Sequence, residues 1–140
     1  MRPVFLDTNI LVYAYDRREL RKYKQATKWL EQQLHNHKIV ISSQVVSEFC
    51  NVMTTKQGML MTTADLQGVI QEVLSPLLEH LPSVEFYQRA VELQAKNSLS
   101  FYDALIIQAG LDLDCSILYS EDLQDGQEFD TLKIINPFVS

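Results

Sequence analysis

VFLDTNILVYAY, residues 4–15, reads as a short apolar strand that runs directly into an apolar helix. Three polar residues, Asp7, Thr8 and Asn9, stand at the joint between the two elements. A single acid at such a joint could simply cap the helix that follows it. The stretch therefore raises the question of whether other acids occupy similar joints elsewhere in the chain.

The rest of the chain alternates between short apolar runs and segments with helical periodicity. Strands are expected over residues 3–6, 38–41, 78–81, 115–120 and 133–138. Helices are expected over residues 20–34 and after Ser42 or Ser43, Thr62 or Thr63, Ser83, and Ser100. We expect Gly58 to end the helix after Ser42 or Ser43, and the next helix to stop before Pro76.

The strand segments are continuous apolar runs rather than alternating ones, which is typical of strands buried on both faces. We therefore predict an α/β fold with a short, mostly parallel central sheet flanked by helices. The length of 140 residues and the absence of a linker-like segment predict a single domain over residues 1–140.

Composition narrows the classes of function. The formal net charge is −6, so binding to nucleic acid through charge alone is not expected unless metal ions or a local patch overcome the repulsion. The acidity also suits a basic protein partner. The N-terminal residues lack a signal-peptide pattern and no apolar stretch could span a bilayer, which predicts a cytoplasmic protein without membrane contact. Cys50 and Cys115 are far apart and are expected to be reduced, mostly buried thiols.

Four acids stand where strands and helices meet. Asp7 directly follows the first strand, and Asp122 follows the strand that begins at Cys115 within a few residues. Glu48 lies one to two turns into the helix after the second strand, and Asp103 lies in the first turn of the helix opened by Ser100. In a parallel sheet the first three would share the carboxyl edge. Asp103 joins them if its helix starts on that side, which the sequence leaves open.

Each acid has a simpler explanation when it is taken alone. Asp7 could be a helix cap, the stretch from Ser100 to Asp103 matches a capping box, Glu48 could be a solvated helix residue, and Asp122 sits in a polar turn. Taken together they suggest a cation site, because clustered carboxylates repel one another and Mg²⁺ or Mn²⁺ prefers oxygen ligands. Thr8, Asn9 and Ser120 could add hydrogen bonds there.

Other catalytic signatures are missing from the sequence. The three histidines, His35, His37 and His80, are not placed to act as a general base, and the first two lie in a polar helix end. The sequence contains neither a glycine-rich phosphate loop nor a GxSxG motif. A metal-assisted reaction on a phosphate group is therefore the chemistry that the residues favour.

Five stretches, in order along nearly the whole chain, resemble the PIN-domain ribonucleases, and in particular the VapC-type toxins of bacterial toxin–antitoxin pairs. They are LDTNILVYAYD (6–16), SSQVVSEF (42–49), LSFYDALIIQAG (99–110), ILYSEDLQDGQ (117–127) and KIINPF (133–138). The resemblance implies an endoribonuclease that hydrolyses RNA phosphodiester bonds with Mg²⁺ or Mn²⁺, as the toxin of a type II toxin–antitoxin system. It also implies a homodimer and a cognate antitoxin, a segment of which covers the active site.

The resemblance carries roles to matching positions in this sequence. Asp7 and Asp103 would be the main metal ligands, and Glu48 and Asp122 would complete the pocket through metal-bound water. Thr8 or Asn9 would orient the site. Ser120 stands where the family often has Thr and keeps the hydroxyl. Glu121 and Asp125 lie close to Asp122 in the sequence, so the identity of the fourth acid stays open here.

Two further interpretations are open at this stage. The chain could be a Mg²⁺-binding phosphoacceptor or regulatory domain similar to a response-regulator receiver. Such domains use a pair of acids after the first strand and a lysine near the last, whereas Asp7 has no adjacent acid and Lys133 follows a polar stretch. The chain could also be a catalytically inactive PIN fold that serves only in assembly. The sequence does not indicate the RNA that is cut, the number of metal ions, the antitoxin or the dimer interface.

Overall fold

A six-stranded sheet forms the centre of the structure, which is a computed structural model that describes residues 2–55 and 60–138. The strand order is β3-β2-β1-β4-β6-β5. The strands are β1 (Val4–Leu6), β2 (Ile39–Ser42), β3 (Leu78–His80), β4 (Ile117–Tyr119), β5 (Glu128–Phe129) and β6 (Leu132–Ile135). All pairs are parallel except β5 with β6, so the prediction of a mostly parallel sheet is confirmed.

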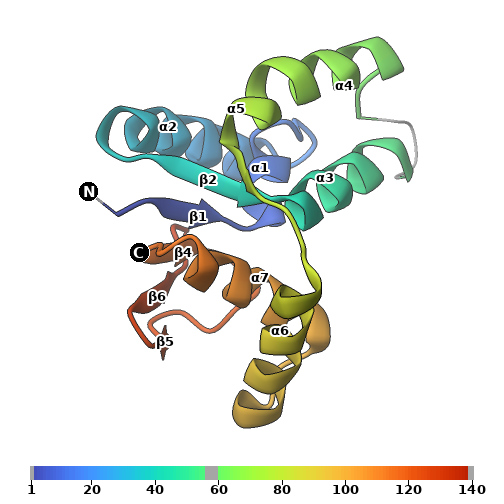
Figure 1. Cartoon of the computed structure of the whole chain (residues 1–140). Helices are drawn as coiled ribbons and strands as arrows, with labels where there is room; N and C mark the ends of the chain where they lie inside the picture. Colours follow the sequence, from blue (N-terminus) through green and yellow to red (C-terminus); the bar gives the residue numbers. More distant parts are fainter. Residues whose placement is uncertain (1, 56–59, 139–140) are drawn as a thin grey trace.

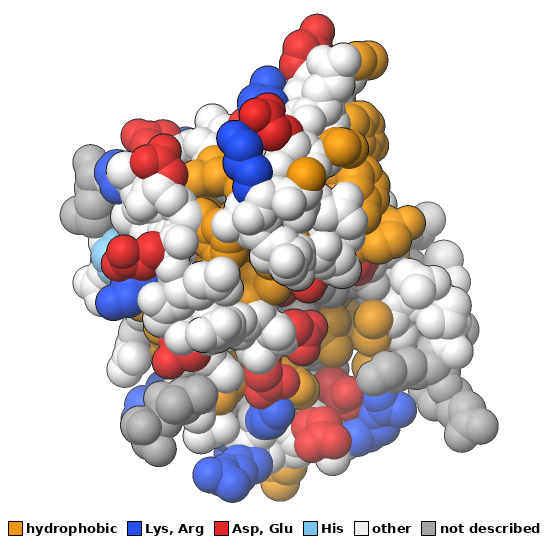
Figure 2. Space-filling model, turned by 90° about the horizontal axis from the view of Figure 1, so that it is seen from below, with side chains coloured by type: hydrophobic (Ala, Val, Ile, Leu, Met, Phe, Trp, Pro, Cys, Tyr) orange, Lys and Arg blue, Asp and Glu red, His pale blue; other side chains and the backbone are white. Residues whose placement is uncertain are grey.

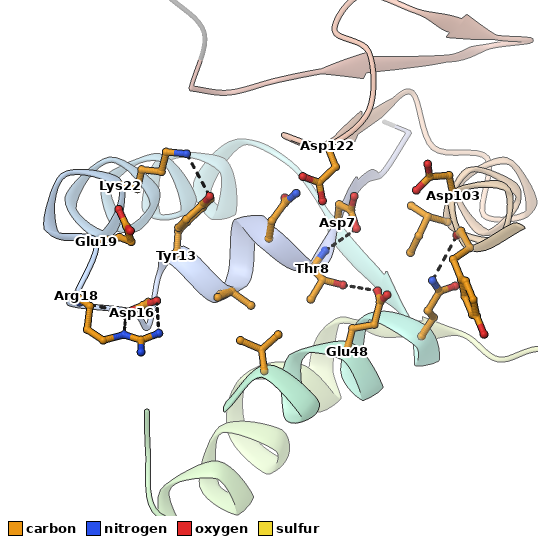
Figure 3. A pocket seen from close by; sticks show the side chains of 16 residues that line it. Asp7, Thr8, Tyr13, Asp16, Arg18, Glu19, Lys22, Glu48, Asp103 and Asp122 are labelled. Atoms are coloured by element: carbon orange, nitrogen blue, oxygen red, sulfur yellow. Dashed lines mark hydrogen bonds and ion pairs between the residues drawn. The ribbon is translucent and has the colours of Figure 1, made fainter. Parts of the chain in front are cut away.

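Helices cover both sides of this sheet. They are α1 (Thr8–Tyr13), α2 (Leu20–Asn36), α3 (Ser43–Thr55), α4 (Thr63–Val69), the π-helix η1 (Ile70–Leu74), α5 (Ser75–Leu77), α6 (Val84–Asn97) and α7 (Phe101–Asp112). Helices α1 and α2 lie on one side of the sheet and α7 lies on the other (Figures 1 and 3). This arrangement is the predicted α/β class, and it leaves the carboxyl edge of the parallel strands open between the two helical layers.

The apolar runs form the elements with the deepest burial. Every residue of β1 and β2 is buried, which explains why these strands are apolar without alternation. Helix α7 is apolar all round and buries seven consecutive residues from Ala104 to Gly110. A Cβ atom at Gly110 would meet Leu132 Cδ2 at 3.1 Å, so the small residue lets α7 approach β6 closely. By contrast α2 buries only Ala26 completely, as expected for an amphipathic surface helix.

Side-chain caps fix where the helices begin. The hydroxyls of Thr62, Ser83 and Ser100 each accept a hydrogen bond from the backbone N–H three residues later, at 3.1 Å in every case. Ser42 rather than Ser43 accepts such a bond at the start of α3, from Val45 N at 3.4 Å. The sequence left a choice of two residues at α3 and α4, and in both cases the first residue caps the helix.

The structure differs from the sequence-based expectation around Pro76. The helix that starts after Thr62 does not stop before Pro76, so that prediction is wrong. The chain passes from α4 through the π-helix η1 into α5, where Pro76 occupies the first turn. Because a helical turn precedes Pro76, its missing N–H interrupts the helical hydrogen bonds where η1 passes into α5. Gly58, which was expected to end the preceding helix, lies outside the described residues.

The end of the chain also differs. Strand β4 is shorter than the predicted 115–120, and the last strand spans Leu132–Ile135 instead of continuing to residue 138. The short strand β5 was not predicted. It pairs with β6 across a tight turn in which Asp130 has a positive φ of 54°. Two paired residues carry too little periodicity to be recognised in a sequence.

The structure also bears on two expectations from the sequence, the lack of a membrane span and the state of the two cysteines. None of the helices in the two described ranges combines the length and apolar character needed to cross a membrane. Both cysteines are free thiols: Cys115 is buried and Cys50 is half-buried. Burial raises the pKa of the Cys115 thiol to about 12, so this group is an unreactive part of the core.

Candidate active site

A cleft of about 700 Å³ opens at the carboxyl edge of β1 and receives all four acids singled out in the sequence. Figure 3 shows the carboxylates of Asp7, Glu48, Asp103 and Asp122 around one space, although they come from different elements. Thr8 and Asn9 also line the cleft, and Ser120 is fully buried beneath it. The structure thus brings together all seven candidate residues.

Asp7 is the most deeply placed of the four acids, with 8% of its surface exposed. It is the N-cap of α1 as well, because its Oδ1 accepts a 2.7 Å hydrogen bond from Thr8 N. Its other oxygen accepts a 2.7 Å bond from Ser120 Oγ. The capping interpretation and the cleft interpretation are therefore both correct for this residue.

The environment of Asp7 shifts its pKa away from the ordinary value. Burial raises the pKa of Asp7 to about 6, although the hydrogen bonds from Ser120 and Thr8 oppose this. The negative charges of Asp122 and Glu48 raise it further. A carboxyl group in this state favours the arrival of a proton or a cation.

Ser120 connects Asp7 to the loop that carries Asp122. Its hydroxyl donates to Asp7 and accepts from Asp122 N and Leu123 N at 3.2 and 3.3 Å. One buried side chain therefore fixes the orientation of the first acid and the path of the loop that presents another.

Glu48 is tied to the same region from a third element. Thr8 Oγ1 donates a 2.8 Å hydrogen bond to Glu48 Oε1, which joins the start of α1 to α3 (Figure 3). Both residues are half-buried. This bond holds the glutamate side chain toward the cleft rather than toward open solvent.

Asp103 enters from the opposite side of the sheet. The first turn of α7 borders the cleft, which resolves the question that the sequence left open. The backbone N–H of Asp103 donates to the capping hydroxyl of Ser100. In the part of the chain that the structure describes, its carboxylate accepts no hydrogen bond, so both oxygens are available to a ligand.

The identity of the fourth acid follows from the partners of its neighbours. Glu121 accepts hydrogen bonds from Lys22 Nζ at 2.5 Å and Tyr13 OH at 2.6 Å. Burial raises the pKa of Glu121, but these hydrogen bonds outweigh burial and hold the pKa below its ordinary value. Asp125 Oδ1 accepts from Asn136 N at 2.8 Å. Asp122 is the acid of this loop that lines the cleft.

Several cleft residues were missed by the sequence analysis. One end of the cleft is lined by Tyr13, Asp16, Arg18, Glu19 and Lys22, and another part by Gln44 and Tyr102. Lys22 lies on the otherwise polar face of α2, where nothing in its spacing separates it from other surface lysines. The run of charged residues directly after α1 was the one sequence feature that could have pointed to these cleft residues. The guanidinium of Arg18 forms two hydrogen bonds to Asp16, so its charge is directed to that acid.

Whether these residues suit a metal ion can be tested on their chemistry. No group of three or more His, Cys, Asp or Glu side chains in residues 2–55 and 60–138 is already positioned as a metal cage. Mg²⁺ does not need one, because it is usually held by one or two carboxylates together with water molecules and substrate oxygens. The donors are all carboxylate oxygens. The pKa of Asp7 is raised mainly by burial and further by the negative charges of Asp122 and Glu48, and a bound cation would offset both effects. The site fits a hard divalent cation.

A further polar atom near the acids has no partner. Asn9 Nδ2 is buried and makes no hydrogen bond within the described residues. Its Oδ1 accepts a long, 3.5 Å bond from Glu121 N. Because buried donors are normally satisfied, this amide is available to an acceptor that enters the cleft.

The chain matches a known family model and is similar in fold to solved structures. A family model for the PIN domain matches residues 4–125. A search of curated proteins finds no match. Three solved structures are similar in fold over most of their length and of this chain, at sequence identities low enough that the likeness concerns the fold alone.

The first of them is a toxin-antitoxin complex from Klebsiella pneumoniae, with a TM-score of 0.67, 19% identity, and 96% of this chain and 98% of the other covered. The second is VapC20 of Mycobacterium tuberculosis, described as a sarcin-ricin loop cleaving toxin (TM-score 0.63, 14% identity, 85% and 89% covered). The third is VapBC2 of Rickettsia felis bound to a DNA fragment from its promoter (TM-score 0.65, 22% identity, 94% and 96% covered).

Proposed function

The chain belongs to the PIN-domain family, and from this premise we propose that it is an endoribonuclease that requires Mg²⁺ or Mn²⁺. We further propose that it acts as the toxin of a type II toxin–antitoxin system. Divalent metal ions are general in this family, and the four carboxylates of the cleft are the groups that would use one here.

The observation that carries the proposal is a group of four acids that share one cleft without an ion-pair partner among the described residues. Asp7, Glu48, Asp103 and Asp122 line one cleft, and no ion pair within the described ranges neutralises any of them. The two cationic residues of the cleft, Arg18 and Lys22, are paired with other acids. Such an arrangement is costly unless a cation joins it.

Each residue has a distinct part in the proposed reaction. Asp7 and Asp103 would hold the metal ion directly, and Glu48 and Asp122 would hold it through water. When bound, a divalent ion supplies an acidic water molecule and stabilises negative charge on a phosphate. Ser120 and Thr8 keep the two oxygens of Asp7 in fixed directions. The free N–H of Asn9 would donate to a phosphate oxygen of the RNA backbone.

The proposed partners are an RNA substrate and a cognate antitoxin. A cluster of carboxylates on a chain of net charge −6 suits a basic inhibitor segment, in which one arginine placed among the acids would displace the metal. Two of the similar structures are toxin-antitoxin complexes, which agrees with this assignment. A complex in which the inhibitor lies far from Asp7 would contradict it. The proposed location is the cytoplasm.

A homodimer is also part of the proposal, and a band of exposed apolar side chains supports it. Figure 2 shows hydrophobic side chains gathered along one flank of the molecule, seen from the end at which α6 lies in Figure 1. On and before α6, the exposed apolar residues are Leu81, Val84, Tyr87 and Val91, with 45–70% of each exposed. Monomers rarely leave such a stripe open to water. Light scattering would test this, with Val84→Lys and Val91→Lys expected to yield monomers.

The experiment that tests the nuclease assignment is cleavage of a labelled total RNA pool by purified protein that is free of antitoxin. We expect discrete products with Mg²⁺ or Mn²⁺, none with EDTA, and none with Asp7→Asn. Asp65→Asn is the matched control, because it makes the same charge change at an exposed residue of α4 outside the cleft. Equal cleavage with EDTA, or by the Asp7→Asn protein, would contradict the proposal.

The alternative of a receiver-like phosphoacceptor finds no support in the geometry. Lys133 pairs in register with Ile117, the first residue of β4, and so lies at the opposite end of that strand from Asp122. An inactive PIN fold is likewise not favoured, because all four acids face the same cleft.

A further inference from the structure

A second cavity lies next to the acidic cleft, on the side of the first turn of α7. Its volume is about 250 Å³, and it is lined by residues from α3, α6 and α7. Pockets for drug-sized ligands usually have volumes of ~300–1,000 Å³, so this one suits a smaller, fragment-sized group.

Two residues belong to the linings of both cavities. Gln44 and Tyr102 line the acidic cleft and the second cavity as well, and Gln44 Nε2 lies 3.4 Å from Tyr102 O. Tyr102 also directly precedes Asp103, one of the proposed metal ligands. A molecule with its phosphate at the acids could therefore extend one of its attached groups past Gln44 and Tyr102 into the second cavity.

The chemistry of the second cavity differs sharply from that of the cleft. No Asp, Glu, Lys or Arg of the described residues lines it. It offers the aromatic rings of Phe86, Tyr87 and Tyr102, together with the hydroxyls of Ser43 and Ser47 and the amide of Gln44. Flat apolar faces with a few neutral hydrogen-bonding groups are suited to an uncharged, planar ligand, and not to a phosphate or a cation.

Exposure makes Tyr102 the most distinctive residue of this cavity. Its side chain is 67% exposed, whereas the adjacent Phe101 packs against the core. Tyr87 is 45% exposed, but it also belongs to the apolar band of α6. Tyr102 is therefore the residue through which a role of the cavity can be tested separately from dimer formation.

Charge gives the reason why an RNA would need such a contact. A net charge of −6 and a cleft of carboxylates provide little of the electrostatic attraction that usually dominates binding to nucleic acids. Stacking of bases on aromatic side chains provides affinity that does not depend on net charge, and it is the common way to hold single-stranded RNA.

We propose that this second cavity binds one base of a single-stranded RNA, next to the phosphate held at the acids, with Tyr102 stacked on the base and Gln44 and Ser47 at its polar edge. The inference rests on the proposed nuclease function and adds to it the part of the substrate that the protein reads. It predicts that the RNA is recognised in an unpaired segment, because a paired base would first have to break its pair and its stacking to enter the cavity.

The test measures RNA binding without cleavage. In the Asp7→Asn background with Mg²⁺, fluorescence anisotropy would follow a labelled single-stranded RNA of mixed sequence and a hairpin of the same composition. We expect Tyr102→Ala to weaken binding of the single strand roughly tenfold and Tyr102→Phe to leave it nearly unchanged, since the phenyl ring still stacks. Leu34→Ala, which removes an exposed apolar group from α2 outside both cavities and outside the apolar band of α6, is the matched control.

Three measurements keep the outcomes distinct. The Tyr102→Ala variant of the otherwise wild-type protein should bind Mn²⁺ with the same affinity as wild type. If its Mn²⁺ affinity falls while its RNA affinity is unchanged, Tyr102 only positions Asp103 and the inference is wrong. Light scattering should show the same oligomeric state; a change in that state without a change in RNA affinity would assign Tyr102 to the dimer and overturn it. Preserved RNA binding through Tyr102 without any metal-dependent cleavage by wild type would instead remove the nuclease assignment and keep the base site.

Discussion

Asp7 and Asp112 are both carboxylates largely withdrawn from water, yet the protein treats them in opposite ways. Asp112, at the end of α7, accepts hydrogen bonds from Arg89 at 2.8 and 3.2 Å, from Gln108 at 2.9 Å, and contacts His80 Nε2 at 3.0 Å. Burial raises the pKa of Asp112, but these partners outweigh burial and hold the pKa below its ordinary value. Asp7 receives only neutral donors, and its pKa is raised to about 6.

The difference separates a structural acid from one that is kept for a ligand. Asp112 is paired with the cation Arg89 and contacts His80, so it links α6, α7 and β3 and has no need of a further partner. Ser120 and Thr8 orient Asp7 but do not neutralise its charge. The charged groups that act on Asp7 are the negative side chains of Asp122 and Glu48. Asp7 is also the more deeply buried of the two acids, and burial is the largest cause of its raised pKa. The two residues therefore differ both in burial and in the charge of their partners.

The largest expected effect concerns catalysis. Asp7→Asn should reduce RNA cleavage more than about 100-fold, because even groups that only support a metal ligand contribute ~10–100-fold. Asp112→Asn should leave the initial rate within about threefold, since it makes the same change at a hydrogen-bonded acid that lies outside the cleft. Initial rates on one defined RNA substrate measure both. Comparable losses in the two variants would erase the functional contrast between the two acids.

The second effect is on stability, and its sign is opposite to that of most substitutions. The native pKa of Asp7, about 6, lies above the ordinary value of 3.8. The native state therefore binds a proton on Asp7 more tightly than the unfolded state does. As a result, the metal-free protein loses stability as the pH rises from about 4 to about 6. Above that range Asp7→Asn should be more stable than wild type by up to about 3 kcal/mol. Urea unfolding at pH 4 and pH 7 in EDTA measures the difference, which should vanish at pH 4.

The third effect runs in the usual direction. Asp112→Ala should destabilise the protein by about 2 kcal/mol, because it leaves the side chains of His80 and Gln108 without their shared acceptor while Arg89 turns to water. The same urea experiment at pH 7 measures it. An increase in stability here, like that expected for Asp7→Asn, would mean that both acids are uncompensated.

The smallest effect sharpens the role of the buried hydroxyl. Ser120→Ala removes a donor that lowers the pKa of Asp7, so we expect this pKa to rise and Mn²⁺ affinity at pH 7 to fall about tenfold. The loss should shrink as pH is raised, because a higher pH removes the competing proton. Calorimetric titration at pH 6, 7 and 8 tests this, and Ser120→Thr, which keeps the hydroxyl, should restore affinity. A loss that is the same at every pH would contradict the proposed linkage.

The sequence was informative wherever a local pattern has a local cause. The buried strands and capping residues could be predicted because continuous apolar runs and hydroxyls at helix starts reflect contacts within a few residues. The positions of Asp7, Glu48 and Asp122 followed from the geometry of parallel strands. The structure places all four acids in the lining of one cleft, while their roles in metal binding remain our proposal.

The sequence-based predictions failed where local structure depends on contacts with residues far away in the sequence. The continuation through Pro76 depends on a π-helical turn that no periodicity announces, and β5 exists because a turn returns the chain to β6. Lys22 and Tyr102 could not be identified as cleft residues because their sequence surroundings are those of ordinary surface residues. Their place depends on which helices the sheet brings together.

The hydrogen bond from Ser120 to Asp7 joins two residues that are 113 positions apart. Strand β1, the first to be synthesised, occupies the middle of the sheet and must wait for β4 to pair along its second edge. A ribosome-bound nascent chain therefore has no acidic cluster until Asp122 has emerged, and proteolytic fragments that separate the two ends lose the cluster altogether. Formation of the cleft is in this sense a late, long-range event in folding, and it reports that almost the whole chain is in place.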